Sequence, residues 1–254
     1  MEEIAYRQHR ALEEAHWWFV GMRAIYRKQL GSLGLPARSR ILDIGCGTGG
    51  NLDLLSTFGS TWAVDMSLTA AAFVRERGFG RISVASATDL PFGDGSFDLV
   101  TAFGVIEHVE NDERMLREML RVTRPGGHTL MVTSAHRWLW SVHDDRVQHV
   151  RRYRRGELRD RVAHAGWRID QLSYVNAALF PPVAAVRLVQ RFIPETEAGR
   201  RSGMSGFGMP PRPLNRALAG LLSLEGSFLE HLDLPMGVGL ICRATRPGGS
   251  GGTR

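Results

Sequence analysis

The sequence predicts an α/β protein with a doubly wound, mostly parallel seven-stranded sheet. Two observations carry this prediction. Short apolar and β-branched runs alternate with segments of helical spacing, which is typical of a parallel sheet with helices on both faces. The first of these runs, residues 41–44, leads directly into the glycine-rich loop DIGCGTGG at 43–50. A loop of this kind after a first strand indicates a ligand site at the carboxyl edge of the sheet.

The expected elements follow one another in order. Residues 1 to about 30 carry apolar and aromatic side chains at helical spacing, and Gly31, Gly34 and Pro36 end this pattern. Strands are expected at 41–44, 61–65, 81–85, 97–103, 129–133, 167–175 and 238–245. Helices are expected near 50–58, 68–77, 111–122 and 155–165.

These elements divide the chain into five expected parts. A helical cap over the ligand site at 1–35 is followed by the ligand-binding core at 36–175. A mostly helical insertion at 176–236 precedes the last sheet strand at 237–246 and a disordered, glycine-rich tail at 247–254. The insertion is rich in apolar residues, so it forms an acceptor pocket, a dimer interface or a membrane-facing patch.

The composition excludes several classes of protein. Two cysteines exclude a disulfide framework, and no Cys/His cluster has zinc spacing, so no metal is expected. The net charge of +6 comes from dispersed arginines, with Lys28 the single lysine and no nucleic-acid reading module, so no nucleic-acid partner is expected. Neither a signal peptide nor a membrane span is predicted, which favours a cytoplasmic protein, with 174–193 as the segment for any peripheral membrane contact.

The glycine loop and one acid downstream indicate a nucleoside ligand. Gly45, Gly47 and Gly49 let the backbone turn sharply and approach a ligand, and the next helix offers free N–H groups. Asp65 closes the second strand about 20 residues later, where a carboxylate accepts two hydrogen bonds from a ribose diol. Both features fit NAD as well as S-adenosylmethionine.

Further strings distinguish these two ligands. Asp43 stands two residues before Gly45, a position that is usually apolar in dinucleotide-binding enzymes. The strings ATDLPFGDGSFDLVTAFGVIEHVEND at 87–112 and RPGG at 124–127 follow. In this order and spacing they resemble the class I S-adenosylmethionine-dependent methyltransferases, over about residues 40–134. The run HWWFVGMR at 16–23 resembles a signature of one subset of that family. The resemblance implies a Rossmann-like methyltransferase fold and S-adenosyl-L-methionine as cofactor.

The resemblance also implies roles for the residues around the glycine loop. Gly45, Cys46 and Gly47 would pack against the methionine moiety, and Asp43 would support its amino group. Asp65 would bind the ribose hydroxyls, with Met66 against the adenine.

Other cofactor contacts are expected from more distant segments. Relatives often carry an Asp that bonds the adenine amino group, but Ser86 stands there, so Ala87 or Thr88 would substitute. Phe103 and Gly104 would lie beside the cofactor. Trp18 and Arg23 would close over it, with Arg23 pairing with its carboxylate. Adjacent tryptophans cannot share one helix face, so one of Trp17 and Trp18 is expected to face inward and the other the cofactor.

Two histidines are the candidate general bases. His108 follows the fourth strand, and an imidazole titrates near neutrality. Its alternative role is to hold the strand–helix junction by hydrogen bonds. Relatives that require a metal carry a glutamate where this chain has Gly104. His149 and Tyr153 belong to the run HVRRY, which resembles a pattern in related methyltransferases; four residues apart, they would share one face of a helix.

The sequence thus predicts a methyltransferase with a small, hydrophobic or lipid-like acceptor. A natural product, a quinone or a prenyl-type chain fits the apolar insertion, with O- or C-methylation favoured and a place in secondary metabolism. An NAD-dependent oxidoreductase and a catalytically silent cofactor-binding protein are the alternatives. A homodimer through the insertion is also compatible with the sequence.

Overall fold

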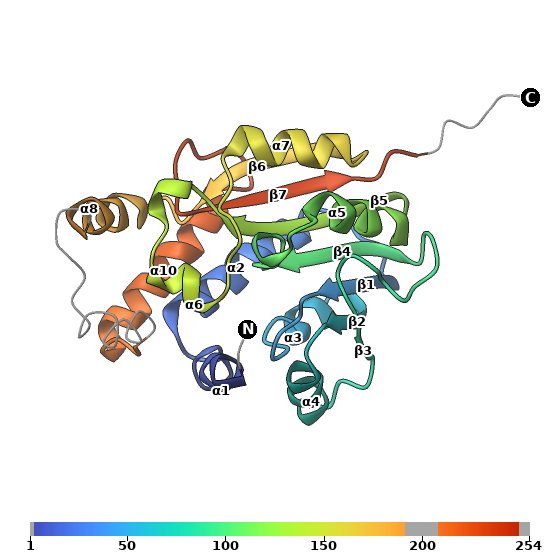
Figure 1. The fold of residues 1–254 in the computed structure, drawn as a ribbon, viewed down its shortest axis with the longest axis horizontal. Coiled ribbons are helices and arrows are strands. Elements are labelled where there is room, and N and C mark those ends of the chain that lie inside the picture. The colour runs from blue at the N-terminus through green and yellow to red at the C-terminus, as the bar shows by residue number, and fades with distance from the viewer. Residues whose placement is uncertain (1–2, 191–207, 249–254) are drawn as a thin grey trace, which may run out of the picture.

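A single seven-stranded sheet forms the centre of the protein (Figure 1). The computed structural model describes residues 3–190 and 208–248. The strand order is β3-β2-β1-β4-β5-β7-β6, and β7 alone runs antiparallel to its neighbours. The strands are β1 (Ser39–Ile44), β2 (Gly59–Asp65), β3 (Ile82–Val84), β4 (Phe97–Phe103), β5 (Thr123–Ser134), β6 (Arg168–Val175) and β7 (Gly239–Thr245). The predicted doubly wound, mostly parallel seven-stranded sheet is therefore confirmed.

Helices cover both faces of the sheet, because the parallel strands are buried on both sides. One face carries α5 (Asp112–Val122) and α7 (Arg155–His164). The other carries α2 (Trp17–Gly31), α3 (Leu52–Ser56), α4 (Leu68–Glu76) and α10 (Arg212–Phe228). Successive residues of β1 alternate between the two apolar cores, with Ile41 in one and Leu42 in the other. The remaining elements are α1 (Glu3–Leu12), α6 (Val142–Arg146), α8 (Phe180–Gln190) and the 3-10 turns Ile106–His108 and Arg137–Leu139.

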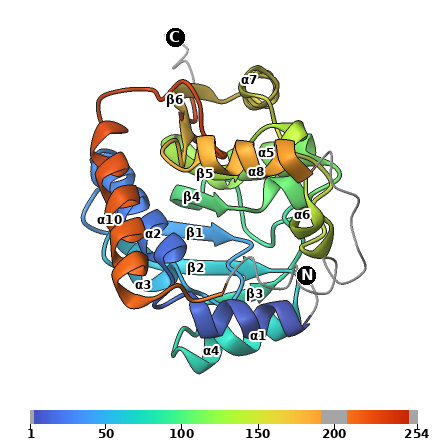
Figure 2. The ribbon, with the colours of Figure 1, turned by 90° about the vertical axis from the view of Figure 1, so that its left-hand side faces the viewer.

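The N-terminal segment forms two helices, so the prediction of one continuous helix to about residue 30 is wrong. The chain leaves helical geometry at His16, whose backbone is extended with ψ 133°. The His16 imidazole accepts a hydrogen bond from the backbone N–H of Trp18 at 3.3 Å and thereby caps α2. Helix α1 consequently turns away from α2 and lies beside α4 (Figure 2).

The last helix, α10, packs along α2 and joins distant parts of the chain (Figure 2). The Asn215 side chain accepts from the Trp17 N–H and donates to the Ala15 carbonyl, both at 2.8 Å. The buried Glu225 carboxylate accepts hydrogen bonds from the N–H groups of Asn176 and Ala177, at 2.5 and 2.8 Å. Helix α10 therefore holds both the α1–α2 turn and the segment that leads into α8.

The expected 176–236 insertion contributes α8 and α10, and its residues 191–207 lie outside the described residues, as do residues 249–254 of the expected disordered tail. Within the described ranges, no helix combines the length and the apolar character that a membrane span requires.

Candidate cofactor and acceptor site

The glycine loop connects β1 to α3 at the carboxyl edge of the sheet. Gly45 and Gly47 have φ values of 63° and 56°, which favour glycine. A Cβ at Gly45 would lie 2.5 Å from Val105 Cγ2, so the loop packs directly on the segment after β4. A Cβ at Gly47 would meet no atom within 4 Å. The outer side of the loop at Gly47 is therefore open for the close approach of a ligand.

Asp65 ends β2 beside this loop and is buried. Its carboxylate accepts hydrogen bonds from the N–H groups of Gly47 and Ser67, both at 2.9 Å. The Tyr6 hydroxyl of α1 donates to the same carboxylate at 3.2 Å. Burial, together with the charge of Asp65, raises the pKa of Tyr6 to about 12, so this hydroxyl remains a donor. The Asp65 carboxylate thus accepts a hydroxyl donor as well as two backbone N–H groups.

Asp43 is the second buried carboxylate of the site. It lies near the end of β1, and the Thr101 hydroxyl donates to its Oδ1 at 2.7 Å. Burial raises the pKa of Asp43 to about 7, against the lowering effect of the Thr101 hydrogen bond. Within the described part of the chain, neither Lys nor Arg forms an ion pair with Asp43. A ligand ammonium would therefore supply the positive charge that favours the ionised carboxylate.

The end of α1 is clamped onto the glycine loop by a buried glutamate. Glu13 Oε2 accepts from the Thr48 hydroxyl at 2.6 Å, and Glu13 Oε1 pairs with the Arg77 guanidinium. Arg77 also donates from Nε to the Thr48 carbonyl at 2.7 Å. We refer to Glu13, Thr48 and Arg77 as the Glu13 clamp. Arg23 lies beside it and donates to the carbonyls of Glu13 and Gly50, at 2.6 and 3.5 Å.

The aromatic residues predicted near the cofactor lie at the same edge. Phe103, at the end of β4, stacks on Tyr26 of α2 with a centroid distance of 4.0 Å and an interplanar angle of 12°. Trp17 and Trp18 are both half-buried in the first turn of α2 and contact the same apolar core, and that one of them faces the cofactor stays a prediction.

The remaining predicted cofactor residues lie in the loops after β2, β3 and β4. Met66 follows Asp65 and is 79% exposed, and Gly104 is exposed with φ 71°. Ala87 and Thr88 are half-buried, and the Thr88 and Ser86 hydroxyls are 2.8 Å apart. Cys46 is buried in the loop itself. The structure thus brings the predicted cofactor residues to the ends of the parallel strands.

A histidine cluster occupies the neighbouring part of this edge. His149 Nδ1 lies 2.7 Å from Asp144 Oδ1, and Arg152 Nε donates to the same oxygen at 2.7 Å. Burial alone raises the pKa of Asp144, but the hydrogen bonds from His149 and Arg152 outweigh it and hold this pKa below its usual range. The His108 ring lies edge-on to that of His149, with centroids 4.6 Å apart. Two imidazoles and a buried carboxylate are therefore in contact.

His108 also forms a hydrogen bond with the backbone, which fits its alternative role of holding the strand–helix junction. Its Nδ1 lies 3.2 Å from the Gln148 carbonyl, which can only accept, so Nδ1 carries the proton and Nε2 keeps its lone pair. Burial lowers the pKa of His108, against the opposing charge of Glu107. The imidazole is consequently neutral at physiological pH.

Glu107 attaches the histidine cluster to the sheet. Its buried carboxylate accepts from the Thr133 hydroxyl at 2.8 Å and from the Ser134 N–H at 3.1 Å. Its backbone carbonyl accepts from the Val150 N–H at 2.8 Å. The cluster is therefore fixed to the ends of β4 and β5, next to Val105 and the glycine loop.

An aromatic group lies beyond β5, near the start of α8. The His136 ring stacks on Tyr174 at a centroid distance of 5.0 Å and is 5.4 Å from Phe180. Trp138 lies 5.9 Å from Phe180 and is 36% exposed. His136 has φ 59°, a strained value for a side chain of this size, which is common near functional sites.

Tyr153 does not join the histidine cluster. Residues 149–153 are extended, because the Tyr153 N–H donates to the Ser134 carbonyl at 2.9 Å and Tyr153 pairs with Ala135. The predicted helix that would give His149 and Tyr153 a common face is therefore wrong. Tyr153 is fully buried, and its hydroxyl donates to Asp112 at 2.6 Å. In that position Tyr153 has a structural role.

Sequence reasoning missed several residues that shape this edge. Tyr6, Glu13 and Arg77 contact the glycine-loop region from other helices, and their sequence neighbours give no signal of it. In the sequence, Asp144 and Arg152 are oppositely charged residues close to the predicted His149. Their pairing depends on a bend in the chain between them that no periodicity marks.

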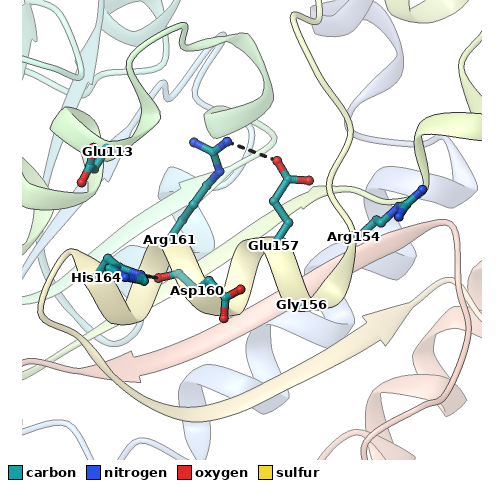
Figure 3. Close-up of a pocket in the computed structure, with 7 residues that line it drawn as sticks. All are labelled: Glu113, Arg154, Gly156, Glu157, Asp160, Arg161 and His164. Carbon is teal, nitrogen blue, oxygen red and sulfur yellow. Dashed lines mark hydrogen bonds and ion pairs between the residues drawn. The ribbon is translucent and has the colours of Figure 1, made fainter.

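A surface hollow of about 700 Å³ lies elsewhere, between α5 and α7 (Figure 3). None of the predicted site residues lines it. Among its charged side chains, Arg161 pairs with Glu157 at 3.2 Å. The candidate site therefore stays at the carboxyl edge of the sheet.

Comparisons with known proteins agree with this geometry. A family model described as a methyltransferase domain matches residues 42–131. The chain is 34% identical over 163 residues to a probable S-adenosylmethionine-dependent methyltransferase of Mycobacterium tuberculosis, over 61% of this chain and 57% of that protein. It is 38% identical over 115 residues to demethylmenaquinone methyltransferase of Beutenbergia cavernae, over 44% of this chain and 48% of that protein. The chain thus spans about half the length of these relatives.

A solved structure shows the same fold. Phosphoethanolamine N-methyltransferase 2 of Haemonchus contortus, in complex with S-adenosyl-L-methionine, superposes with a TM-score of 0.55 at 20% identity. The superposition covers 86% of this chain and 51% of the solved one. The glycine loop, the strand order and the matched family model together identify residues 42–131 as a methyltransferase domain, and the chain is similar to S-adenosylmethionine-dependent methyltransferases.

Proposed function

We propose that this chain methylates a small, hydrophobic or lipid-like acceptor with S-adenosyl-L-methionine. The observation that carries the proposal is the pair of buried carboxylates, Asp43 and Asp65, at the ends of adjacent strands on either side of an open glycine loop. When bound, S-adenosylmethionine supplies an electrophilic methyl group.

Each of the two carboxylates is assigned to a different polar group of the cofactor. Asp65 receives the ribose hydroxyls, because it already accepts a hydroxyl donor from Tyr6. Asp43 receives the ammonium group, because its burial makes a cation the most favourable partner. Gly45, Cys46 and Gly47 form the floor beneath the methionine part.

The other cofactor contacts extend the proposal around this core. Exposed Met66 is the apolar contact for the adenine, with Ala87 and Thr88 beside it. Phe103 and Gly104 border the cofactor at the end of β4. Trp18 and Arg23 of α2 close the site from the cap, and Arg23 keeps donors for a carboxylate because a guanidinium has five N–H groups.

His149 is the proposed general base. Asp144 can only accept, so Nδ1 of His149 carries the proton of this hydrogen bond, and Nε2 is the nitrogen assigned to the acceptor proton. A carboxylate behind an imidazole also stabilises the imidazolium that forms when His149 takes the acceptor proton. His108, which burial keeps neutral, is the second candidate general base beside His149. Base catalysis suits a hydroxyl or an activated carbon, which favours O- or C-methylation.

Two observations support a hydrophobic acceptor. The aromatic group of Trp138, Phe180 and His136 lies beyond β5, on the side of the histidine cluster. Aromatic side chains with a few placed polar groups are typical of pockets for small ligands. One relative is, by its name, a demethylmenaquinone methyltransferase, which acts on a quinone-type acceptor. A quinol, a phenolic natural product and a prenyl-type chain are therefore the first acceptors to test.

The test is release of S-adenosylhomocysteine from S-adenosylmethionine with a panel of quinols, phenols and prenylated alcohols. The chain is expected to turn over at least one of them. His149→Asn is expected to lower kcat by about 100-fold with unchanged S-adenosylmethionine affinity. His164→Asn, at an exposed histidine of α7, is the matched control and leaves kcat unchanged.

Two results would contradict the proposal separately. Unchanged turnover in His149→Asn would show that His149 is not the general base, whereas the proposed methyl transfer would still stand. Tight S-adenosylmethionine binding without turnover of any acceptor class would favour a catalytically silent protein.

A further inference from the structure

Asp65 accepts hydrogen bonds from three different segments of the chain. Its Oδ2 accepts from the Gly47 N–H at 2.9 Å. Its Oδ1 accepts from the Ser67 N–H at 2.9 Å and from the Tyr6 hydroxyl at 3.2 Å. An ionised carboxylate has about four lone-pair positions. These three donors therefore leave about one position for a further hydrogen bond.

A ribose diol needs two positions on the carboxylate, because each of its hydroxyls donates one hydrogen bond. One of the three present donors must consequently leave Asp65 when the diol binds. Two of these donors are backbone N–H groups, and only the Tyr6 hydroxyl belongs to a side chain. Tyr6 is also 6% exposed, so its ring fills space beside the carboxylate that a bound ribose would need.

The two backbone donors are fixed by the elements around them. Gly47 belongs to the glycine loop, and the preceding Cys46 N–H donates to the Val64 carbonyl of β2 at 3.1 Å. Ser67 is the N-cap of α4, and its side chain accepts from the Ala70 N–H at 3.4 Å. Removing either backbone donor from Asp65 would disturb the loop or the start of α4. Tyr6 is therefore the donor that leaves.

The position of Tyr6 on α1 allows this movement. Helix α1 lies beside α4 (Figure 2), and its end is held on the glycine loop by the Glu13 clamp. Tyr6 lies seven residues before Glu13, which is about 10 Å along a helix. The Tyr6 side chain can therefore leave Asp65 while the Glu13 clamp still holds the end of α1.

We propose that the Tyr6 hydroxyl occupies the ribose position of Asp65 in the free protein and that the ribose diol of the cofactor displaces it. The inference rests on the proposed function, since it takes Asp65 as the ribose ligand. Cofactor binding thereby breaks the Tyr6–Asp65 hydrogen bond. S-adenosylhomocysteine carries the same ribose, so Tyr6 weakens the binding of cofactor and product alike and returns to Asp65 when the product leaves.

Calorimetric titration of Tyr6→Phe tests the proposal. The variant keeps the buried ring but has no hydroxyl on Asp65 to displace. Its Kd is expected to fall about tenfold for both S-adenosylmethionine and S-adenosylhomocysteine. Tyr153→Phe is the matched control, because it also removes a tyrosine–aspartate hydrogen bond, 2.6 Å long, to Asp112 of α5. Its Kd for S-adenosylmethionine is expected to equal that of the wild type, and circular dichroism checks that both variants are folded.

A nucleoside without the diol provides a second test. Adenosine is expected to bind Tyr6→Phe about tenfold more tightly than the wild type. In contrast, 2′,3′-dideoxyadenosine is expected to bind both proteins equally, because it brings no ribose hydroxyl to Asp65.

Fluorine NMR of protein labelled with 3-fluorotyrosine follows Tyr6 itself. The chain has four tyrosines, and the Tyr6 signal is the one that is missing from Tyr6→Phe. This signal is expected to shift when S-adenosylmethionine or adenosine is added, and to stay in place with 2′,3′-dideoxyadenosine.

Three outcomes would overturn the proposal. A Kd of Tyr6→Phe equal to or above that of the wild type would show that Tyr6 does not compete with the cofactor. A Tyr6 fluorine signal that S-adenosylmethionine leaves unchanged would show that the tyrosine stays on Asp65. An equal gain in affinity for 2′,3′-dideoxyadenosine would assign the effect to something other than the diol.

Failure of the proposed function gives a different result. A folded wild type that binds no S-adenosylmethionine, or unchanged binding in Asp65→Ala, would remove the ribose role of Asp65 and with it the displacement of Tyr6. Normal binding that is lost in Asp65→Ala, together with an unchanged Kd in Tyr6→Phe, would overturn only the role of Tyr6.

Discussion

The Thr101 hydroxyl donates a hydrogen bond to Asp43 Oδ1 at 2.7 Å, between neighbouring strands β1 and β4. It is a neutral donor to a buried carboxylate, so it reduces the cost of burying Asp43 without supplying a positive charge. Burial accordingly keeps the pKa of Asp43 at about 7. The first two predictions follow from this arrangement.

Asp43→Asn is expected to stabilise the free protein at neutral pH and to abolish S-adenosylmethionine binding. The folded pKa of about 7 exceeds the ordinary aspartate value of 3.8, so the folded state binds the proton more tightly between these values. The contribution of protonated Asp43 to the free energy of unfolding is fully present below about pH 4 and is lost as the pH rises to about 7. Thermal melts should show a Tm gain of about 2–4 °C for the variant at pH 8 and a smaller gain at pH 5. An equal gain at both pH values would contradict the assignment.

Binding of S-adenosylmethionine at pH 6 is expected to release about one proton from Asp43. At that pH the free carboxyl is mostly protonated, and an ammonium partner favours the ionised form. Calorimetric titrations in two buffers of different ionisation enthalpy measure this proton directly. Wild-type binding with no buffer dependence at pH 6 would show that Asp43 does not meet the ammonium group.

Gly47→Ala is expected to lose S-adenosylmethionine affinity by at least about tenfold while losing only ~1–2 kcal/mol of stability. The new Cβ meets no protein atom within 4 Å, so its only steric conflict is with a ligand on the open side of the loop. Gly34→Ala is the matched control, since its φ of 61° and open surroundings impose the same backbone strain away from the site. Equal loss of affinity in both variants would assign the effect to folding.

Glu13→Ala is expected to lower the free energy of unfolding by ~3 kcal/mol, because it leaves the buried Arg77 guanidinium without its buried partner. The glycine loop also loses its contact through Thr48, so S-adenosylmethionine affinity falls with stability. Glu14→Ala removes the other carboxylate on Arg77, but Glu14 is 57% exposed, and a loss under about 1 kcal/mol is expected. Urea unfolding of both variants measures the difference, and similar losses would refute a special role of Glu13.

The sheet and the cofactor edge were predictable from sequence because both depend on local patterns. Strands such as 97–103 are short apolar runs, and Asp43 and Asp65 stand at fixed distances from the glycines. The break at His16 was not predictable from helical spacing, since residues on both sides of it continue the apolar pattern. Glu13 is fixed by Thr48 and Arg77, which are 35 and 64 residues away.

The histidine cluster shows the same limit. His149 was identified from a motif, but its partner Asp144 depends on the turn between them, and Tyr153 is drawn into the core by Asp112 of α5. Tertiary hydrogen bonds override the helical spacing in that segment. Such long-range contacts leave no periodic mark in one sequence.

Isothermal titration of the full chain with S-adenosylmethionine, and separately with NAD, tests the central claim most directly. We expect micromolar binding of S-adenosylmethionine, none of NAD, and loss of S-adenosylmethionine binding in Asp65→Ala. A folded wild-type protein that gives no heat with S-adenosylmethionine at high micromolar concentration, or that binds NAD instead, would contradict the account.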